Sequence, residues 1–66
     1  MSHEENVLRL TEVKRLTGLS RSTIYRLEAA KKFPERIRLS ERATGWKAHE
    51  VLAWTNSRPR ASSLAV

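Results

Sequence analysis

Hydrophobic positions in the first part of the chain recur at helical spacing and predict a short helix. After an extended entry over Val7–Leu10, Val13 and Leu16 stand three residues apart on one face. Thr11 is the expected N-cap of this helix. Gly18 is expected to end it, because glycine adopts the left-handed backbone of a helix C-terminus at little steric cost. A helix of about seven residues does not persist in water alone, so we expect it to pack against its neighbours.

A second helix is predicted after a short turn. Ser20 is the expected N-cap, and the helix runs from Arg21 to about Lys31. Ile24 and Leu27 mark its buried face. The segment ends before Phe33–Pro34, since proline disfavours a helical residue before it.

Two further helix positions predict an ion pair. Glu28 precedes Lys32 by four residues, the spacing at which opposite charges meet on a helix surface. We therefore expect these two side chains to pair.

Beyond Pro34 the pattern changes to alternation, which predicts a hairpin. Residues 36–40 alternate polar and apolar side chains, as in a half-buried strand. Residues 41–45 are the expected connection, in which Gly45 can take a positive φ. Trp46, and with it Lys47, forms the expected returning strand.

A third helix is predicted from Ala48 to about Ser57, before the break at Pro59. Trp46, Trp54 and Phe33 are assigned to the core, because they would supply its bulk. The predicted organisation is a lead-in over residues 1–6, one domain over 7–58 and a flexible tail over 59–66.

Composition excludes several classes of protein. The chain has 66 residues, enough for one small domain. It has no cysteine, and its seven acidic residues are all glutamates. His3 and His49 lie far apart in sequence, so we expect no metal site and no cofactor. No apolar run reaches the ~18 residues of a membrane span. No acid–base pair or activated nucleophile is evident, so we expect a cytoplasmic binding protein without enzymatic activity.

The charge is basic and concentrated in the folded part of the chain. The net charge is +6, and residues 9–47 contain eleven Lys and Arg against four Glu. A basic folded segment is typical of nucleic-acid binders. Composition alone does not distinguish between DNA, RNA and an acidic membrane surface as the partner. It also allows that the charge only keeps the protein in solution.

The motif over Thr11–Arg26 has the layout of a helix-turn-helix, in which the second helix enters the major groove by its N-terminal end. Arginine can hold guanine in a two-pronged hydrogen bond, and hydroxyls can bond several bases. A generic helical hairpin with a solvated face is the alternative. The expected base-reading residues are Arg21, Ser22 and Thr23, the expected backbone contacts are Ser20, Tyr25, Arg26 and Lys47, and the expected wing contacts are Arg36, Arg38, Arg42 and Thr44.

The sequence also resembles the AlpA-like family of phage and prophage regulators. The resemblance lies in residues 10–13, 17–26 (TGLSRSTIYR), 33–34, 45–46 and 50–54. It implies an excisionase-like or MerR-like winged helix-turn-helix, mainly α with a small β-hairpin, that binds DNA. Two departures lie around Phe33–Pro34, where family members often have a preceding glycine and a following second proline. This chain has Lys32 before the pair and Glu35–Arg36 after it.

Three functions follow from the residues and the resemblance. The first is a sequence-specific regulator of transcription, often of an integrase gene. The second is a recombination directionality factor that bends DNA at attachment sites. The third is an adaptor that holds a protein or RNA. For the first two, the expected partners are double-stranded DNA, neighbouring monomers on DNA, integrase and RNA polymerase.

Overall fold

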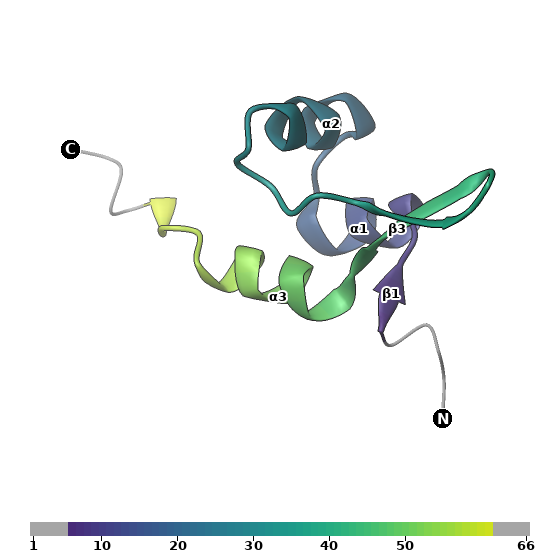
Figure 1. The fold of residues 1–66 in the computed structure, drawn as a ribbon. Helices are drawn as coiled ribbons and strands as arrows, with labels where there is room; N and C mark the ends of the chain where they lie inside the picture. The colour runs from purple at the N-terminus through teal and green to yellow at the C-terminus, as the bar shows by residue number, and fades with distance from the viewer. Residues whose placement is uncertain (1–5, 62–66) are drawn as a thin grey trace.

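The computed structural model describes residues 6–61, which form three helices and a small antiparallel sheet (Figure 1). The elements are β1 (Val7–Leu8), α1 (Leu10–Thr17), α2 (Arg21–Ala29), β2 (Ile37–Ser40), β3 (Ala43–Lys47) and α3 (Ala48–Asn56). In Figure 1, α2 lies above α1 and α3, and the β2–β3 hairpin projects to one side. This order confirms the predicted winged helix-turn-helix, mainly α with a small hairpin.

The start of α1 differs from the prediction. The helix begins at Leu10, so Arg9 is its N-cap and the expected cap at Thr11 is wrong. The Arg9 carbonyl accepts the N–H groups of Glu12 and Val13, each at 3.0 Å. The arginine side chain has no hydrogen-bond acceptor, so the helix begins without a side-chain cap.

The turn between α1 and α2 forms as predicted. Gly18 has a φ of 74°, and its N–H donates to the Lys14 carbonyl at 2.8 Å. Ser20 then begins α2, and its side-chain oxygen accepts the Thr23 N–H at 3.2 Å. This hydrogen bond satisfies one of the free donors at the helix N-terminus.

The end of α2 comes two residues before the predicted Lys31. Lys31 has a φ of 64°, and its N–H donates to the Glu28 carbonyl, while the Lys32 N–H donates to Leu27 at 2.8 Å. These two bonds form a Schellman motif with Lys31 at the position that glycine usually occupies. The expected Glu28–Lys32 pair is wrong because Lys32 lies beyond the helix; Glu28 binds Arg36 instead.

The sheet has the order β1-β3-β2, so β3 is the central strand. Leu8 pairs with Trp46 on one side, and Ile37 pairs with Gly45 on the other. The returning strand begins at Ala43, and the connection shrinks from five predicted residues to the turn at 41–42. The register shifts between Arg38 and Ser40, as at a β-bulge.

Gly45 lies inside β3, so its predicted place in the connection is wrong, and it does not adopt the positive φ that the connection would have allowed. The residue is buried, and a Cβ there would lie 2.8 Å from Val7 Cγ1 and 2.9 Å from the Leu8 carbonyl oxygen. Glycine is required because the neighbouring strand β1 leaves no room for a Cβ at this position.

The core lies where α1, α2 and α3 meet the sheet. Trp46 is fully buried, as predicted, and the Phe33 ring packs against its edge with centroids 6.4 Å apart. Trp54 is half-buried, and Leu16, expected in the core, is 43% exposed. Thr17 takes the inner position beside Leu16 and donates its hydroxyl to the Val13 carbonyl. The buried hydrophobic residues are Leu8, Val13, Ile24, Phe33, Trp46, Ala48 and Val51.

Candidate nucleic-acid interface

Three hydroxyl side chains surround the N-terminus of α2. Ser20 Oγ lies 3.3 Å from Ser22 Oγ and donates to Thr23 Oγ1 at 3.0 Å. Thr23 is half-buried, whereas Ser22 is exposed. The structure therefore engages Ser20 and Thr23 in capping and leaves Ser22 on the accessible face.

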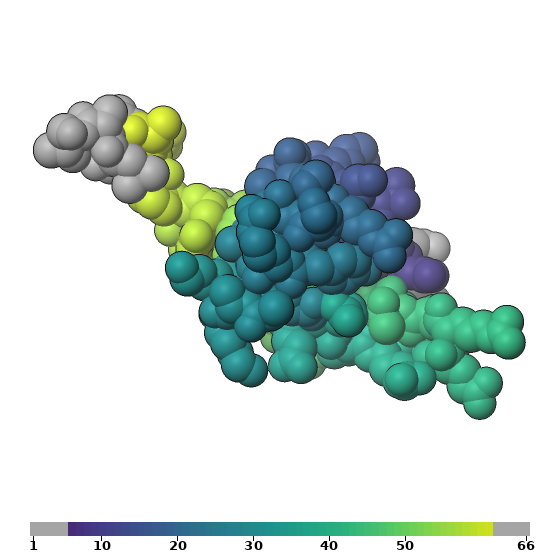
Figure 2. All heavy atoms as spheres, turned by 90° about the horizontal axis from the view of Figure 1, so that it is seen from above, coloured from purple at the N-terminus to yellow at the C-terminus, as the bar shows by residue number. Residues whose placement is uncertain are grey.

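The outer face of α2 is polar and accessible. Arg21, Ser22 and Arg26 are exposed. Ser22 and Arg26 lie on the side of the helix opposite the fully buried Ile24, and Arg21 lies at the edge of this face beside Tyr25. Figure 2 shows α2 in the middle of the face seen from above, with the hairpin extending to one side. Two predicted base-reading residues thus share this face with one predicted backbone contact.

Tyr25 lies at the boundary between this face and the core. Its ring is half-buried and packs against Trp46, with centroids 6.3 Å apart. The guanidinium carbons of Arg21 and Arg36 lie 5.4 and 4.8 Å from its ring centroid. Cations at this distance are attracted to the face of an aromatic ring, so Tyr25 orients two arginines beside the outer face of α2.

Arg36 is held at the base of the hairpin. Its backbone N–H donates to Glu28 Oε2 at 2.7 Å, and its guanidinium pairs with Glu28 Oε1. The Glu28 side chain is only 11% exposed. Arg36 therefore connects α2 to the hairpin, in addition to the wing contact expected of it.

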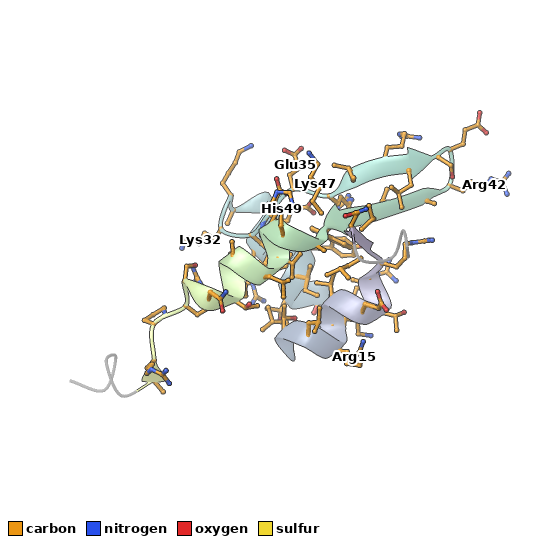
Figure 3. The ribbon with its side chains drawn as sticks, turned by 90° about the horizontal axis from the view of Figure 1, so that it is seen from below. Arg15, Lys32, Glu35, Arg42, Lys47 and His49 are labelled. Atoms are coloured by element: carbon orange, nitrogen blue, oxygen red, sulfur yellow. The ribbon has the colours of Figure 1, made fainter. Side chains whose placement is uncertain are left out.

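The hairpin carries the other predicted wing residues. Arg38, Arg42 and Thr44 are all exposed, and Arg38 Nη1 donates to the Glu41 carbonyl at 3.3 Å. Arg42 extends from the tip of the hairpin (Figure 3). The hairpin thus presents two arginines away from the core.

Lys47 lies apart from the outer face of α2. It lines a shallow hollow together with Arg36 and the carboxylates of Glu35 and Glu50. Figure 3 shows it beside Glu35 and His49 in the view from below. The carboxylates reduce the local positive potential, so this region is less suited to phosphate than α2 or the hairpin.

The pairing of Glu28 with Arg36 is not predicted by the sequence pattern. Arg36 is eight residues away from Glu28, across the end of α2 and the loop, so no helical spacing relates them. The four-residue spacing between Glu28 and Lys32 was the local pattern in the sequence, and it predicted the wrong partner for Glu28.

Two features are absent from residues 6–61, a metal-binding cluster and a membrane-spanning helix. That part of the chain has no group of three or more His, Cys, Asp or Glu side chains placed to hold a metal ion. Among the same residues, no helix is long and apolar enough to cross a membrane.

The exposed, capped second helix and the basic hairpin define the class of winged helix-turn-helix proteins. The chain belongs to the family described as "Prophage CP4-57 regulatory protein (AlpA)", whose model matches residues 6–59. It is also 44% identical over 55 residues to "Uncharacterized protein ORF88" of Enterobacteria phage P4. That match covers 83% of this chain and 62% of the relative, so the chain spans less than two thirds of the relative's length. The family description names a class of prophage regulatory proteins.

Proposed function

We propose that the protein is a sequence-specific double-stranded DNA-binding regulator of transcription, of phage, prophage or genomic-island type. The observation that carries this proposal is the outer face of α2. Arg21, Ser22 and Arg26 are exposed there around a capped helix N-terminus, with Ile24 buried behind them. Membership of a family of prophage regulatory proteins supports the same reading.

In this proposal the N-terminal part of α2 enters the major groove. Arg21 reads a guanine edge and Ser22 bonds a neighbouring base. Arg26, one turn further, binds a phosphate beside the groove. Tyr25 holds the Arg21 guanidinium in place through its ring, so that less side-chain freedom is lost on binding.

The hairpin acts as the wing. Arg38 and Arg42 are exposed on it and bind backbone phosphates next to the segment that α2 reads. The Glu28–Arg36 pair fixes the base of the hairpin to α2, so the helix and the wing contact DNA in a defined relative position.

Equilibrium binding to duplex DNA and to single-stranded RNA tests the proposal. A duplex is first selected from a random pool, and a scrambled duplex of the same composition is the control. We expect tighter binding to the selected duplex than to the scrambled duplex or the RNA. The log–log dependence of affinity on salt should have a slope of roughly −4 to −5 per monomer, as counterions are released from the backbone.

Two results would contradict the proposal. Preference for single-stranded RNA over every duplex would indicate the adaptor function. A salt slope shallower than about −2 would mean that the basic side chains do not lie along a DNA backbone.

A further inference from the structure

A second group of cations lies at the end of the molecule away from the hairpin tip. Lys31 and Lys32 follow α2, and Arg58 follows α3; all three are exposed. Residues 51–61 contain no acidic side chain. Lys31 lines a hollow with Glu28 and Glu35, of which Glu28 is already paired with Arg36. We refer to Lys31, Lys32 and Arg58 as the distal cationic cluster.

Trp54 fixes the two parts of this cluster together. Its indole Nε1 donates to the Lys32 carbonyl at 2.7 Å, and the Phe33 ring packs edge-on against it with centroids 4.8 Å apart. The Arg58 guanidinium carbon lies 4.4 Å from the indole centroid, and Arg58 Nε donates to the Trp54 carbonyl at 3.3 Å. The segments that carry Lys32 and Arg58 are therefore held together by the packed rings of Trp54 and Phe33.

Lys31 occupies a strained backbone position. Its φ of 64° is in the left-handed region, at the place in a Schellman motif where glycine fits best. The turn itself would be more stable with glycine, so the backbone gives no reason for lysine here. What lysine adds is an exposed positive charge at the C-terminal end of α2.

The cluster and the hairpin lie on opposite sides of α2. In Figures 1 and 2 the hairpin extends to one side of this helix, and the segment after α3 extends to the other. The two cationic parts are thus placed to reach the DNA backbone on the two sides of the groove that α2 enters.

We propose that the distal cationic cluster binds DNA phosphates on the side opposite the wing, so that α2 is flanked by two backbone contacts. This inference rests on the proposed DNA-binding function. The lysine ammonium groups act as point charges toward phosphate, and the stacked Arg58 guanidinium is held ready by Trp54. These contacts carry affinity and register, and base preference stays with α2.

The test compares two double variants of equal charge change. Lys31→Gly with Lys32→Gln removes two charges of the cluster. Lys14→Gln with Arg15→Gln removes an adjacent exposed pair on α1, where Arg15 extends from that helix in the view of Figure 3. Both proteins and the parent chain are titrated on the selected and scrambled duplexes at several salt concentrations.

For the cluster variant we expect affinity to fall by about ten-fold on both duplexes and the salt slope to become shallower by about 2. The variant should fold at least as well as the parent, because Lys31→Gly relieves the left-handed backbone. Alone, that substitution should raise Tm by about 4–8 °C. The α1 variant should keep a slope close to that of the parent.

Footprinting of the DNA backbone with hydroxyl radicals then locates the contact. The cluster variant should lose protection at one end of the site, and Arg42→Gln should lose it at the other. The proposal is overturned if both variants lose the same end, or if the two double variants change the slope equally. A variant that keeps its slope but loses cooperative binding on longer duplexes would assign the cluster to contacts between protein copies. Failure of the parent chain to bind any duplex would overturn the proposed function as well.

Discussion

Glu28 Oε2 accepts the backbone N–H of Arg36 at 2.7 Å, and the same carboxylate pairs with the Arg36 guanidinium. One nearly buried side chain of α2 thereby holds the residue that directly precedes β2. The Arg36 guanidinium also lies over Tyr25, which rests on Trp46 in the core. The position of the hairpin relative to α2 therefore depends on a polar contact supported by aromatic packing.

Glu28→Ala should lower the free energy of unfolding by about 1–3 kcal/mol, because it leaves the Arg36 N–H and guanidinium without their acceptor. Glu35→Ala, at an exposed carboxylate of the same loop, should change it by less than about 0.5 kcal/mol. Urea denaturation of both variants measures the difference. Equal stability of the Glu28→Ala variant and the parent would show that the hairpin does not need this anchor.

Ser20→Ala should lower stability by about 1 kcal/mol, because the Thr23 N–H loses its acceptor at the start of α2. Ser22→Ala makes the same chemical change on the outer face and should leave stability within about 0.5 kcal/mol of the parent. Thermal melting separates the two effects. If Ser22→Ala destabilises as much as Ser20→Ala, the hydroxyls act as one capping network and Ser22 is not free for a base.

Gly45→Ala should lower stability by about 2–3 kcal/mol, because the new methyl group meets Val7 Cγ1 and the Leu8 carbonyl. Gly18→Ala meets no neighbouring atom within 4 Å and should cost about 1 kcal/mol from its positive φ alone. Adding Val7→Ala to Gly45→Ala should recover part of the loss, since only the side-chain clash is relieved. Denaturation curves of the three variants check this order of stability. If Val7→Ala recovers no stability in the Gly45→Ala background, the loss comes from the clash with the Leu8 carbonyl alone.

Trp46→Ala should cost about 3–5 kcal/mol, which a domain of this size is not expected to tolerate. Trp54 is only half-buried, so Trp54→Ala should cost less, and Trp54→Phe should lose mainly the hydrogen bond to Lys32. Circular dichroism during heating shows whether each variant still unfolds cooperatively. A folded Trp46→Ala protein alongside an unfolded Trp54→Ala protein would reverse the ranking of the two tryptophans.

Arg21→Ala should cost about 1–3 kcal/mol on the selected duplex and relax the preference at one or two base pairs. Arg38→Ala should weaken binding to selected and scrambled duplexes by similar factors and make the salt slope shallower by about one. Titrations at two salt concentrations distinguish base reading from backbone contact. If Arg38→Ala abolishes the preference while Arg21→Ala weakens both duplexes equally, the hairpin is the reader.

Local signals in the sequence determined the order of the elements. Gly18 and Ser20 act through bonds to residues within four positions, so the turn and cap were predictable from their side chains. Alternation after Pro34 predicted the hairpin, and the apolar positions Ile24 and Trp46 predicted fully buried residues. The exposure of Arg21 and Ser22 on α2 was also predictable from the sequence, because these two residues directly follow the N-cap Ser20.

Tertiary structure alone decided the contacts that join distant segments. The pairing of Leu8 with Trp46 makes β3 a central strand, and it explains why Gly45 lacks a side chain. The choice of Arg36 over Lys32 as the partner of Glu28 depends on where α2 ends. The ends of a short helix or strand are set by tertiary packing more than by local sequence. The periodicity of a segment also does not indicate which distant residue will contact a given side chain.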